Sequence, residues 1–363
     1  MFFKQVSKRK YLKVFFLLLL IVFIQIITID SIWVEKYYSN GFFQIFAGIL
    51  RIIAGWLSFS IGDLFYLLAA IWLIYKIIRF IIKLIRRQLT GKDIQNAFIK
   101  VSLIATFAYI IFNIFWGLNY NRKGIAYQLK LETTKYGSGD LKNIQELLLE
   151  KVNARKQVLI YKHESYPDDK ELFSRAYECY NKSEQVYPFL HLNYPSLKSS
   201  VFGWLGNYLG FTGYYNPFSG EAQVNTTVPR FILPYIACHE IAHQLGYAKE
   251  DEAGLTGYLA VTASNDTLFH YSAYLDLFLY ANRELFFIDS VAAKQVIKQL
   301  IPEVKADIKE WQEFLIRHRS AVEPFIRWAY GRYLIANQQP KGMRTYNEVI
   351  AGLIAFYKKT GRI

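Results

Sequence analysis

Cysteine is scarce in this 363-residue chain, and its scarcity limits how the chain can be cross-linked. There are only two cysteines, Cys179 and Cys238, so no more than one disulfide can form within the chain. Such a bond would suit an extracytoplasmic domain, but Cys238 lies in an uncharged stretch, which favours a small packed thiol. After Asn119 we find no low-complexity stretch and no internal repeat, so the sequence does not indicate a repeat array.

Acidic residues are scarce in the first hundred positions. Residues 1–100 hold 14 lysines and arginines against 4 acidic residues, whereas the rest of the chain carries a net charge of only +4. The formal net charge of +14 is therefore concentrated beside apolar segments. Such a distribution is typical of membrane topology signals, so the sequence predicts a lipid bilayer as a partner and no nucleic acid.

Long apolar runs dominate the same part of the chain, and three of them are long enough to cross a bilayer. We expect membrane-spanning helices near residues 12–30, 62–82 and 100–118. The first run follows a basic N-terminus, as in a signal peptide. However, no cleavage site of small residues comes after it, which favours an uncleaved anchor with a cytoplasmic N-terminus. These spans contain few ionisable residues, which argues against a transporter.

The segment 42–59 is also apolar, but it contains Gln44 and Arg51 and allows two interpretations. If it crossed the membrane, only four residues would separate it from the next span, and the basic loop after that span would face outward. If it is interfacial or re-entrant, the loop stays in the cytoplasm, as the positive-inside rule requires. We expect the second arrangement, with residues 1–118 as the anchor and residues 119–363 as an extracytoplasmic domain.

The sequence of this domain predicts a mainly helical fold. Apolar periodicity predicts helices at residues 140–159, 171–182, 250–262 and 268–285. The stretch 187–220 is rich in glycine, proline and aromatics and should consist mostly of loops. At its end, residues 211–215 and 222–226 flank Asn216–Gly220 and predict a β-hairpin. This hairpin either pairs with an extended peptide substrate through its edge or only covers the core.

The strongest chemical signal is the stretch from Pro234 to Gly246, which contains His-Glu-x-x-His. Residues four apart share one face of a helix, so His239 and His243 can both direct an imidazole at one metal ion. Glu240 lies about 100° further round the helix, where it can act as a general base without binding the metal. The alternative, a surface helix with two solvated histidines, fits less well with its uncharged neighbours.

A third ligand should follow Gly246, where a glycine lets the chain reverse. The candidates are Glu250 and Glu252, because Lys249 cannot ligate as an ammonium ion. Two histidines, one carboxylate and an open position form a hydrolytic zinc site, so the expected cofactor is Zn²⁺. A residue that stabilises the transition state is not singled out by spacing; the available groups are Tyr258, His270, Arg344 and Tyr346.

The stretch Glu250-Asp-Glu-Ala-Gly254 resembles the Glu-x-x-small-Asp/Asn signature of gluzincin metallopeptidases, whose first glutamate binds zinc. The resemblance favours Glu250 as the ligand and leaves Glu252 as the second choice. It implies a zincin-like domain with a small β-sheet before the motif helix, and a protein or peptide as the substrate. Gly254 departs from the signature, because such families carry there a side chain that orients a ligand histidine.

The whole chain also resembles an uncharacterised family of membrane proteins from the Bacteroidetes, with a helical anchor and a zincin-like domain. The resemblance rests on Ser60–Asp63, Gly213–Glu221, the motif helix and Pro340–Tyr346. It implies a peptidase and names no substrate. With zinc and the base Glu240 from the motif, and the topology expected above, the sequence predicts a zinc peptidase on the periplasmic side of the bacterial cytoplasmic membrane. The alternative is a non-catalytic envelope protein that binds a partner and keeps a structural or vestigial zinc site.

Overall fold

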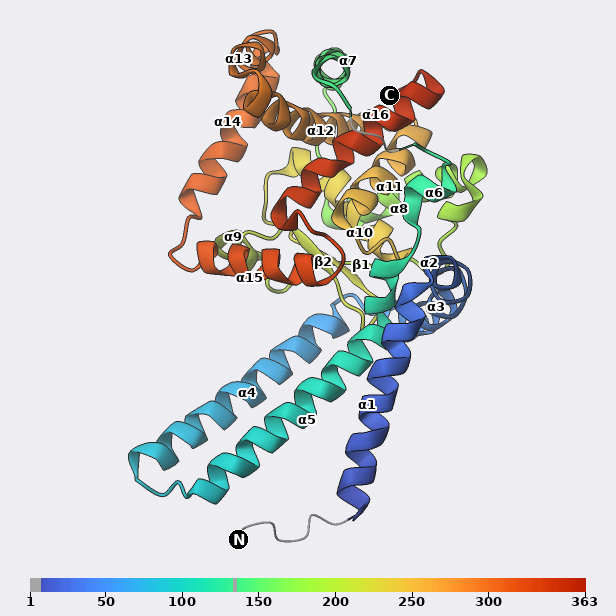
Figure 1. The fold of residues 1–363 in the computed structure, drawn as a ribbon. Helices are drawn as coiled ribbons and strands as arrows, with labels where there is room; N and C mark the ends of the chain where they lie inside the picture. The colour runs from blue at the N-terminus through green and yellow to red at the C-terminus, as the bar shows by residue number, and fades with distance from the viewer. Residues whose placement is uncertain (1–7, 133–135) are drawn as a thin grey trace.

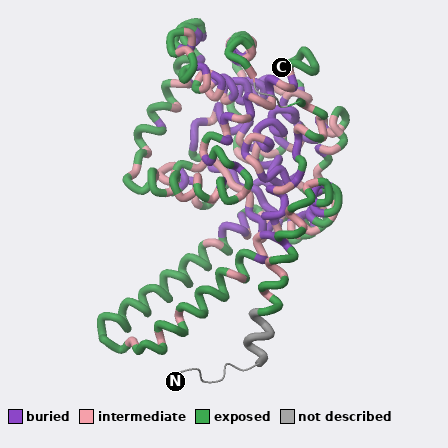
Figure 2. Tube along the Cα trace, viewed as in Figure 1, coloured by how far each residue is buried: buried purple, intermediate pink, exposed green. Residues whose placement is uncertain are grey.

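The computed structural model describes residues 8–132 and 136–363, and it is mostly helical. A pair of long helices and the first helix extend from one side of a rounded domain (Figure 1). The residues of these helices whose burial is described are mostly exposed, whereas buried residues fill the domain and the junction between the two parts (Figure 2). The first seven residues of the expected anchor lie outside the described residues.

Two helices within the described residues are long and apolar enough to cross a membrane: α4 (Ile61–Ile85) and α5 (Gly91–Phe115). They correspond to the spans expected near 62–82 and 100–118. The second begins nine residues earlier than expected, because Thr90 and Asp93 form a capping box at its start. It also ends earlier, because Leu118 belongs to the 3₁₀ helix η2 (Gly117–Asn121).

The segment before α4 is bent. It comprises α1 (Lys8–Ile29), α2 (Ser31–Trp33), the π-helix η1 (Val34–Phe42) and α3 (Phe43–Ala54). The described part of α1 and the helix that follows meet at about 90°, next to Asp30, whose side chain accepts hydrogen bonds from two amides of the new helix. The two arms can form a third, broken span or a re-entrant loop. Alone, α3 has 12 residues and is too short to cross a bilayer.

The helix α3 packs against the domain instead. Arg51 is 1% exposed and donates hydrogen bonds to the carbonyl oxygens of Asn193 and Gln244. Gln44 donates to the carbonyl oxygen of Leu245, at the end of the motif helix. The two polar residues noted in this apolar segment therefore bind main-chain groups of the domain.

The domain contains a small sheet and a set of packed helices. Its helical elements from the start of the domain to the sheet are α6 (Gly124–Gln128), α7 (Ser138–Tyr161), α8 (Asp169–Val186) and η3 (Pro188–Leu190). The later ones are α9 (Gly203–Leu209), η4 (Arg230–Ile232), α10 (Leu233–Gln244), α11 (Glu250–Ala263), α12 (Thr267–Ile288), α13 (Ser290–Lys298), α14 (Pro302–Arg317), α15 (Glu323–Ala336), η5 (Gly342–Glu348) and α16 (Val349–Thr360). The four helices expected from periodicity are α7, α8, α11 and α12.

The described strands form one mixed sheet in the order β1–β3–β2. β1 (Leu197–Ser199) is parallel to β3 (Ala222–Val224), and β2 (Gly213–Tyr215) is antiparallel to it. The expected hairpin is therefore present, with shorter strands. The preceding stretch is more ordered than expected, because it also holds β1 and α9. The sequence of α9 gives little helical signal, because Gly203 and Gly206 both disfavour a helix. In the structure the side chain of Asn225 packs closely against Gly203 and that of Phe211 against Gly206.

Candidate metal centre

The motif helix α10 begins and ends where its sequence predicts. Pro234 lies in the first turn, where a missing amide hydrogen costs nothing, and Gly246 adopts a positive φ of 83° just after the end. The His239 and His243 rings lie one turn apart with centroids 4.9 Å from each other. The two imidazoles therefore face the same side of the helix.

The reversal after Gly246 brings α11 back against α10 and places Glu250, its first residue, beside both histidines. Glu250 Oε2 is 3.2 Å from His239 Nε2 and 3.6 Å from His243 Nε2. Gly257 lets the helices come close, because a side chain there would press on the backbone of His239. One potential ligand atom from each of the three residues lies within 4.8 Å of the others, so His239, His243 and Glu250 form a candidate metal triad.

Glu252, the second choice for the third ligand, points elsewhere. Its carboxylate accepts a hydrogen bond from Lys249 Nζ at 3.2 Å. The same carboxylate fits against Gly124, where any larger residue would clash with it. The structure thus brings Glu250 to the histidines and leaves Glu252 in a contact with α6.

The groups that orient the triad come from outside the motif. His243 Nδ1 lies 2.7 Å from the carbonyl oxygen of Tyr247, which leaves Nε2 free to face Glu250. Tyr330, on α15, donates to Glu250 Oε1 at 2.7 Å, and the Glu250 amide donates to the side-chain oxygen of Gln339. Neither Tyr330 nor Gln339 was found from the sequence, because each follows Glu250 by at least 80 residues with no characteristic spacing.

The resemblance noted in the sequence predicts an acidic or amide side chain at position 254, and the surroundings of Gly254 leave little room for one. A side chain at this position would meet Val349 at 3.0 Å. The carbonyl oxygen of Gly254 accepts a hydrogen bond from the Tyr235 hydroxyl at 2.8 Å. Position 254 therefore contributes no side chain to the site, and the contacts that hold His243 and Glu250 come from Tyr247 and Tyr330.

Glu240 lies beside the triad without joining it. It is 4% exposed, and its Oε2 atom has no hydrogen-bond partner among the described residues. Gly213 of strand β2 passes directly over the carboxylate, and a Cβ at that glycine would clash with it. Within the described sheet β2 pairs with a strand on one side only, so it is an edge strand. The edge strand β2 and the carboxylate of Glu240 therefore lie together beside the triad.

Burial and mutual contacts shift the pKa values of the ionisable groups in the metal-free site. Burial raises the pKa of Glu240 to about 8 and lowers that of His239. Burial would also lower the pKa of His243, but the contact with Glu250 raises it to about 9. For Glu250, hydrogen bonds from the two histidines outweigh burial and hold its pKa well below the usual range. An anionic carboxylate thus occupies a buried position between two imidazoles.

This donor set fits a divalent metal such as zinc. Two imidazole nitrogens and one carboxylate oxygen converge, and the unpartnered oxygen of Glu240 lies next to them. Nitrogen and carboxylate ligands in this number are those of hydrolytic zinc sites, which keep one position open. His239, His243 and Glu250 are the residues that would hold the ion.

Of the four residues available for transition-state stabilisation, only Tyr346 comes near the triad. Its ring stacks beside that of His239, with centroids 6.4 Å apart. His270 Nε2 instead contacts main-chain carbonyls at the end of α11. Tyr258 is buried in the core, and the guanidinium of Arg344 lies over the ring of Phe287.

The two cysteines are both buried and unbridged in the described structure. Burial raises the pKa of the Cys238 thiol, and a hydrogen bond with Cys179 raises it further. The packed-thiol interpretation of Cys238 agrees with this environment.

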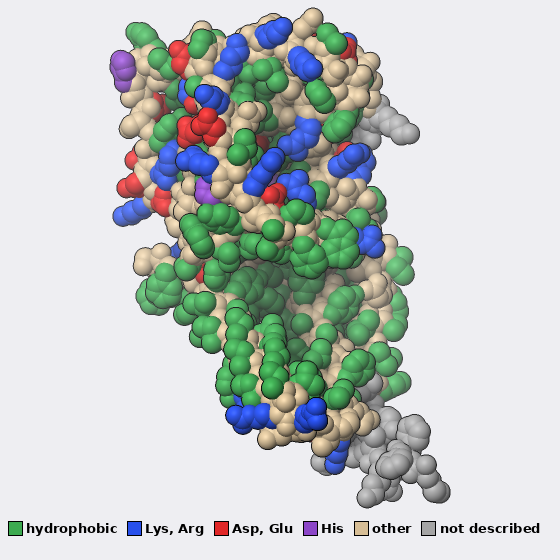
Figure 3. All heavy atoms as spheres, turned by 90° about the vertical axis from the view of Figure 1, so that its left-hand side faces the viewer, with side chains coloured by type: hydrophobic (Ala, Val, Ile, Leu, Met, Phe, Trp, Pro, Cys, Tyr) green, Lys and Arg blue, Asp and Glu red, His purple; other side chains and the backbone are tan. Residues whose placement is uncertain are grey.

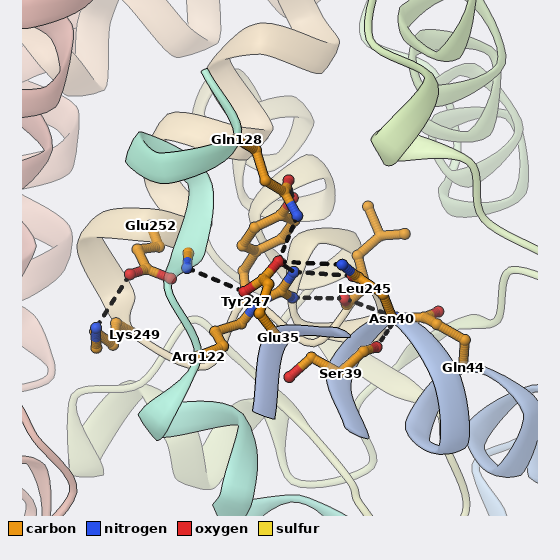
Figure 4. A network of polar contacts seen from close by, with 11 residues as sticks. Glu35, Ser39, Asn40, Gln44, Arg122, Gln128, Leu245, Tyr247, Lys249 and Glu252 are labelled. Atoms are coloured by element: carbon orange, nitrogen blue, oxygen red, sulfur yellow. Dashed lines mark hydrogen bonds and ion pairs between the residues drawn. The ribbon is translucent and has the colours of Figure 1, made fainter. Parts of the chain in front are cut away.

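A buried ion pair connects the bent segment to the end of the motif helix (Figure 4). Arg122 binds Glu35 with two nitrogens, at 2.6 and 2.9 Å, and both side chains are almost fully buried. The same guanidinium donates to the Leu245 carbonyl oxygen at 3.2 Å and lies over the ring of Tyr247. Arg122 thereby connects η1 to the loop whose carbonyl orients His243.

We expect Arg122→Met to destabilise the full-length protein by about 3–5 kcal/mol, because it leaves the carboxylate of Glu35 buried without a counter-charge. Denaturant unfolding in detergent measures this loss. The control is the double variant Glu35→Gln/Arg122→Met, in which no unpaired charge remains and most of the stability should return. A single variant no less stable than the double variant would contradict a structural role for the ion pair.

The chain matches a family model described as a protein of unknown function, DUF3810, over residues 38–354. This match covers most of the bent segment's η1 and α3, both long apolar helices and nearly all of the domain with its triad. No curated protein and no solved structure matches the chain. The chain therefore belongs to the DUF3810 family of proteins of unknown function.

Proposed function

We propose that the protein is a membrane-anchored, zinc-dependent metallohydrolase of the gluzincin type that cleaves peptide bonds. One observation carries the proposal: the described fold brings His239, His243 and Glu250 together, and the buried carboxylate of Glu240 lies beside them with an unused oxygen. A structural metal site has no need of such a carboxylate, whereas hydrolysis requires a base at this place.

Each residue has a distinct role in this proposal. A zinc ion held by the triad would polarise the substrate carbonyl and lower the pKa of water towards neutrality. Glu240 takes the proton from the attacking water and delivers it to the nitrogen of the leaving amine. Tyr247 and Tyr330 keep His243 and Glu250 in position.

The edge of β2 is the proposed place for the substrate backbone. It passes over Glu240, and an extended peptide can add to such an edge through main-chain hydrogen bonds. Tyr346, beside His239, is the group we place nearest to the developing oxyanion.

The distribution of basic residues supports an extracytoplasmic position for the domain. Lysines and arginines gather at the end of the α4–α5 pair that lies farthest from the domain (Figure 3). This end includes Lys83, Arg86, Arg87 and Lys92. Under the positive-inside rule that end lies in the cytoplasm, so the domain would lie on the opposite side of the bacterial cytoplasmic membrane.

Removal of the metal tests the proposal. We expect the full-length protein in detergent to cleave an unfolded protein such as casein, with the products identified by mass spectrometry. A zinc chelator should abolish cleavage, and added Zn²⁺ should restore it. Cleavage that persists after complete removal of the metal would contradict the proposal, and the absence of any cleavage by zinc-loaded protein would favour the non-catalytic alternative.

A further inference from the structure

Exposed apolar side chains gather on two short helices of the domain, α9 and α15. On α15, Phe325 and Trp328 are each 62% exposed and Ile335 is 45% exposed, and their spacing places them on one face. Near α9, Val201 and Trp204 are 66% and 67% exposed. Figure 3 shows hydrophobic side chains in a continuous band where the domain meets the long helices. Single exposed apolar residues are common, but a continuous cluster of them indicates a surface that contacts a protein or a membrane.

Both helices are tied to the ends of the two long apolar helices. The Val201 amide donates to Asp63, in the first turn of α4, at 2.8 Å. Tyr333, on the inner face of α15, packs against Phe112 in the last turn of α5. α9 and α15 therefore lie level with the domain-side ends of α4 and α5, as Figure 1 also shows.

The lengths of α4 and α5 indicate where their domain-side ends lie in a bilayer. Each has 25 residues, which corresponds to roughly 37 Å at about 1.5 Å per residue. The hydrocarbon core of a bilayer is about 30 Å thick, so the ends of both helices extend into the headgroup layer. Trp56, 78% exposed, and Phe59, 50% exposed, come just before α4 at the same level.

We propose that the exposed faces of α9 and α15 lie in the interfacial layer of the bilayer that α4 and α5 cross. Three features favour lipid over a protein partner. The apolar surface continues that of the long helices, and the most hydrophobic stretch of α4 has no buried residue. Tryptophan, exposed here at positions 204 and 328, is one of the two residue types enriched at membrane interfaces. Arg332 is exposed on the same side of α15 as Trp328, where it can reach lipid phosphates.

This docking would place the candidate metal centre at the membrane surface. The opposite face of α15 carries Tyr330, which donates to Glu250, and Trp116, at the end of α5, lies 6.0 Å from the His243 ring between centroids. If the protein is a peptidase as proposed above, its substrates are then polypeptide segments that emerge from or lie on the membrane. That consequence rests on the proposed function, whereas the docking itself does not.

Spin labels can measure the docking directly. The variants Trp328→Cys and Trp204→Cys would be labelled in full-length protein reconstituted in phosphatidylcholine–phosphatidylglycerol vesicles. Oxygen concentrates in lipid, whereas a nickel chelate stays in water. The rates at which each label collides with these two reagents show whether the label lies in lipid or in water. Val291→Cys on α13 is the matched control, because Val291 is 65% exposed and lies at the far end of the domain. The unmodified protein, with both cysteines buried, serves as the labelling blank.

We expect labels at 328 and 204 to collide more often with oxygen than with the nickel chelate, and the label at 291 to show the reverse. Exposure to the chelate should be several-fold lower at 328 and 204 than at 291. A label at 328 as open to the chelate as that at 291 would overturn the proposal. Low collision rates with both reagents would also overturn it, because they would mean that protein covers this face. The readout does not depend on metal or cleavage, so its failure is distinct from failure of the proposed function.

Discussion

Glu240→Gln is expected to reduce peptide cleavage by about 10²–10⁴-fold, the usual contribution of a general base. Glutamine has almost the same shape as glutamate, but it cannot take a proton from water. Because Glu240 stands outside the triad, the variant should bind zinc as tightly as the wild type. Cleavage rates and zinc content of the same preparation give both values.

The conservative replacement matters because Glu240 is buried beneath Gly213. Glutamine keeps the volume that β2 packs against, so unfolding should not account for a loss of activity. Glu252→Gln is a suitable control, since this glutamate is also buried but contacts Lys249 instead of the triad. Full activity in Glu240→Gln would exclude the proposed mechanism, and loss of zinc would mean that Glu240 is a ligand.

Glu250→Gln is expected to weaken zinc binding by more than about 100-fold. Replacing a group that only orients a ligand costs about 10–100-fold, and Glu250 supplies the one negative charge of the triad. Titration of the metal-free protein with Zn²⁺ against a competing chelator measures the change. Tyr330→Phe, which removes the hydroxyl that holds Glu250, should cause a smaller loss, within about 10–100-fold.

The paired variant Glu252→Gln separates the two candidates for the third ligand. Its carboxylate lies against Gly124 and Lys249, so its zinc affinity should remain within a few-fold of the wild type. The opposite order, with strong loss in Glu252→Gln and little in Glu250→Gln, would show that the loop after Gly246 rearranges when metal binds.

The parts of the site that depend on local chain geometry could be predicted from the sequence. His239 and His243 share a face because they are four residues apart on a helix, and Gly246 allows the reversal that brings Glu250 to them. The same is true of the hairpin around Asn216–Gly220, whose turn residues mark it.

The groups that support the triad could not be predicted, because tertiary packing alone brings them there. Tyr330 and Gln339 reach Glu250 from a helix and a loop that no motif connects to it. The Glu35–Arg122 pair joins residues 87 positions apart across a stretch that includes two long helices. Sequence periodicity describes single elements and contains no information about such contacts.

The bent segment illustrates the same limit. From its apolar composition, 42–59 could be judged only as a crossing or an interfacial segment. In the structure Arg51 and Gln44 bind the end of the motif helix, so the segment forms part of the domain's support. For this reason each experiment uses the full-length chain and not the domain alone, which would expose the buried surface that receives Arg51 and Glu35.

Metal content of the wild-type protein is the most direct test of the central claim. The full-length chain would be purified in detergent without chelators, loaded with Zn²⁺ and freed of excess, and its metal measured by mass spectrometry. The triad predicts about one zinc per chain, which mutation of His239 to alanine should remove. Folded protein that retains only trace zinc, or that retains zinc equally well in His239→Ala, would contradict the account.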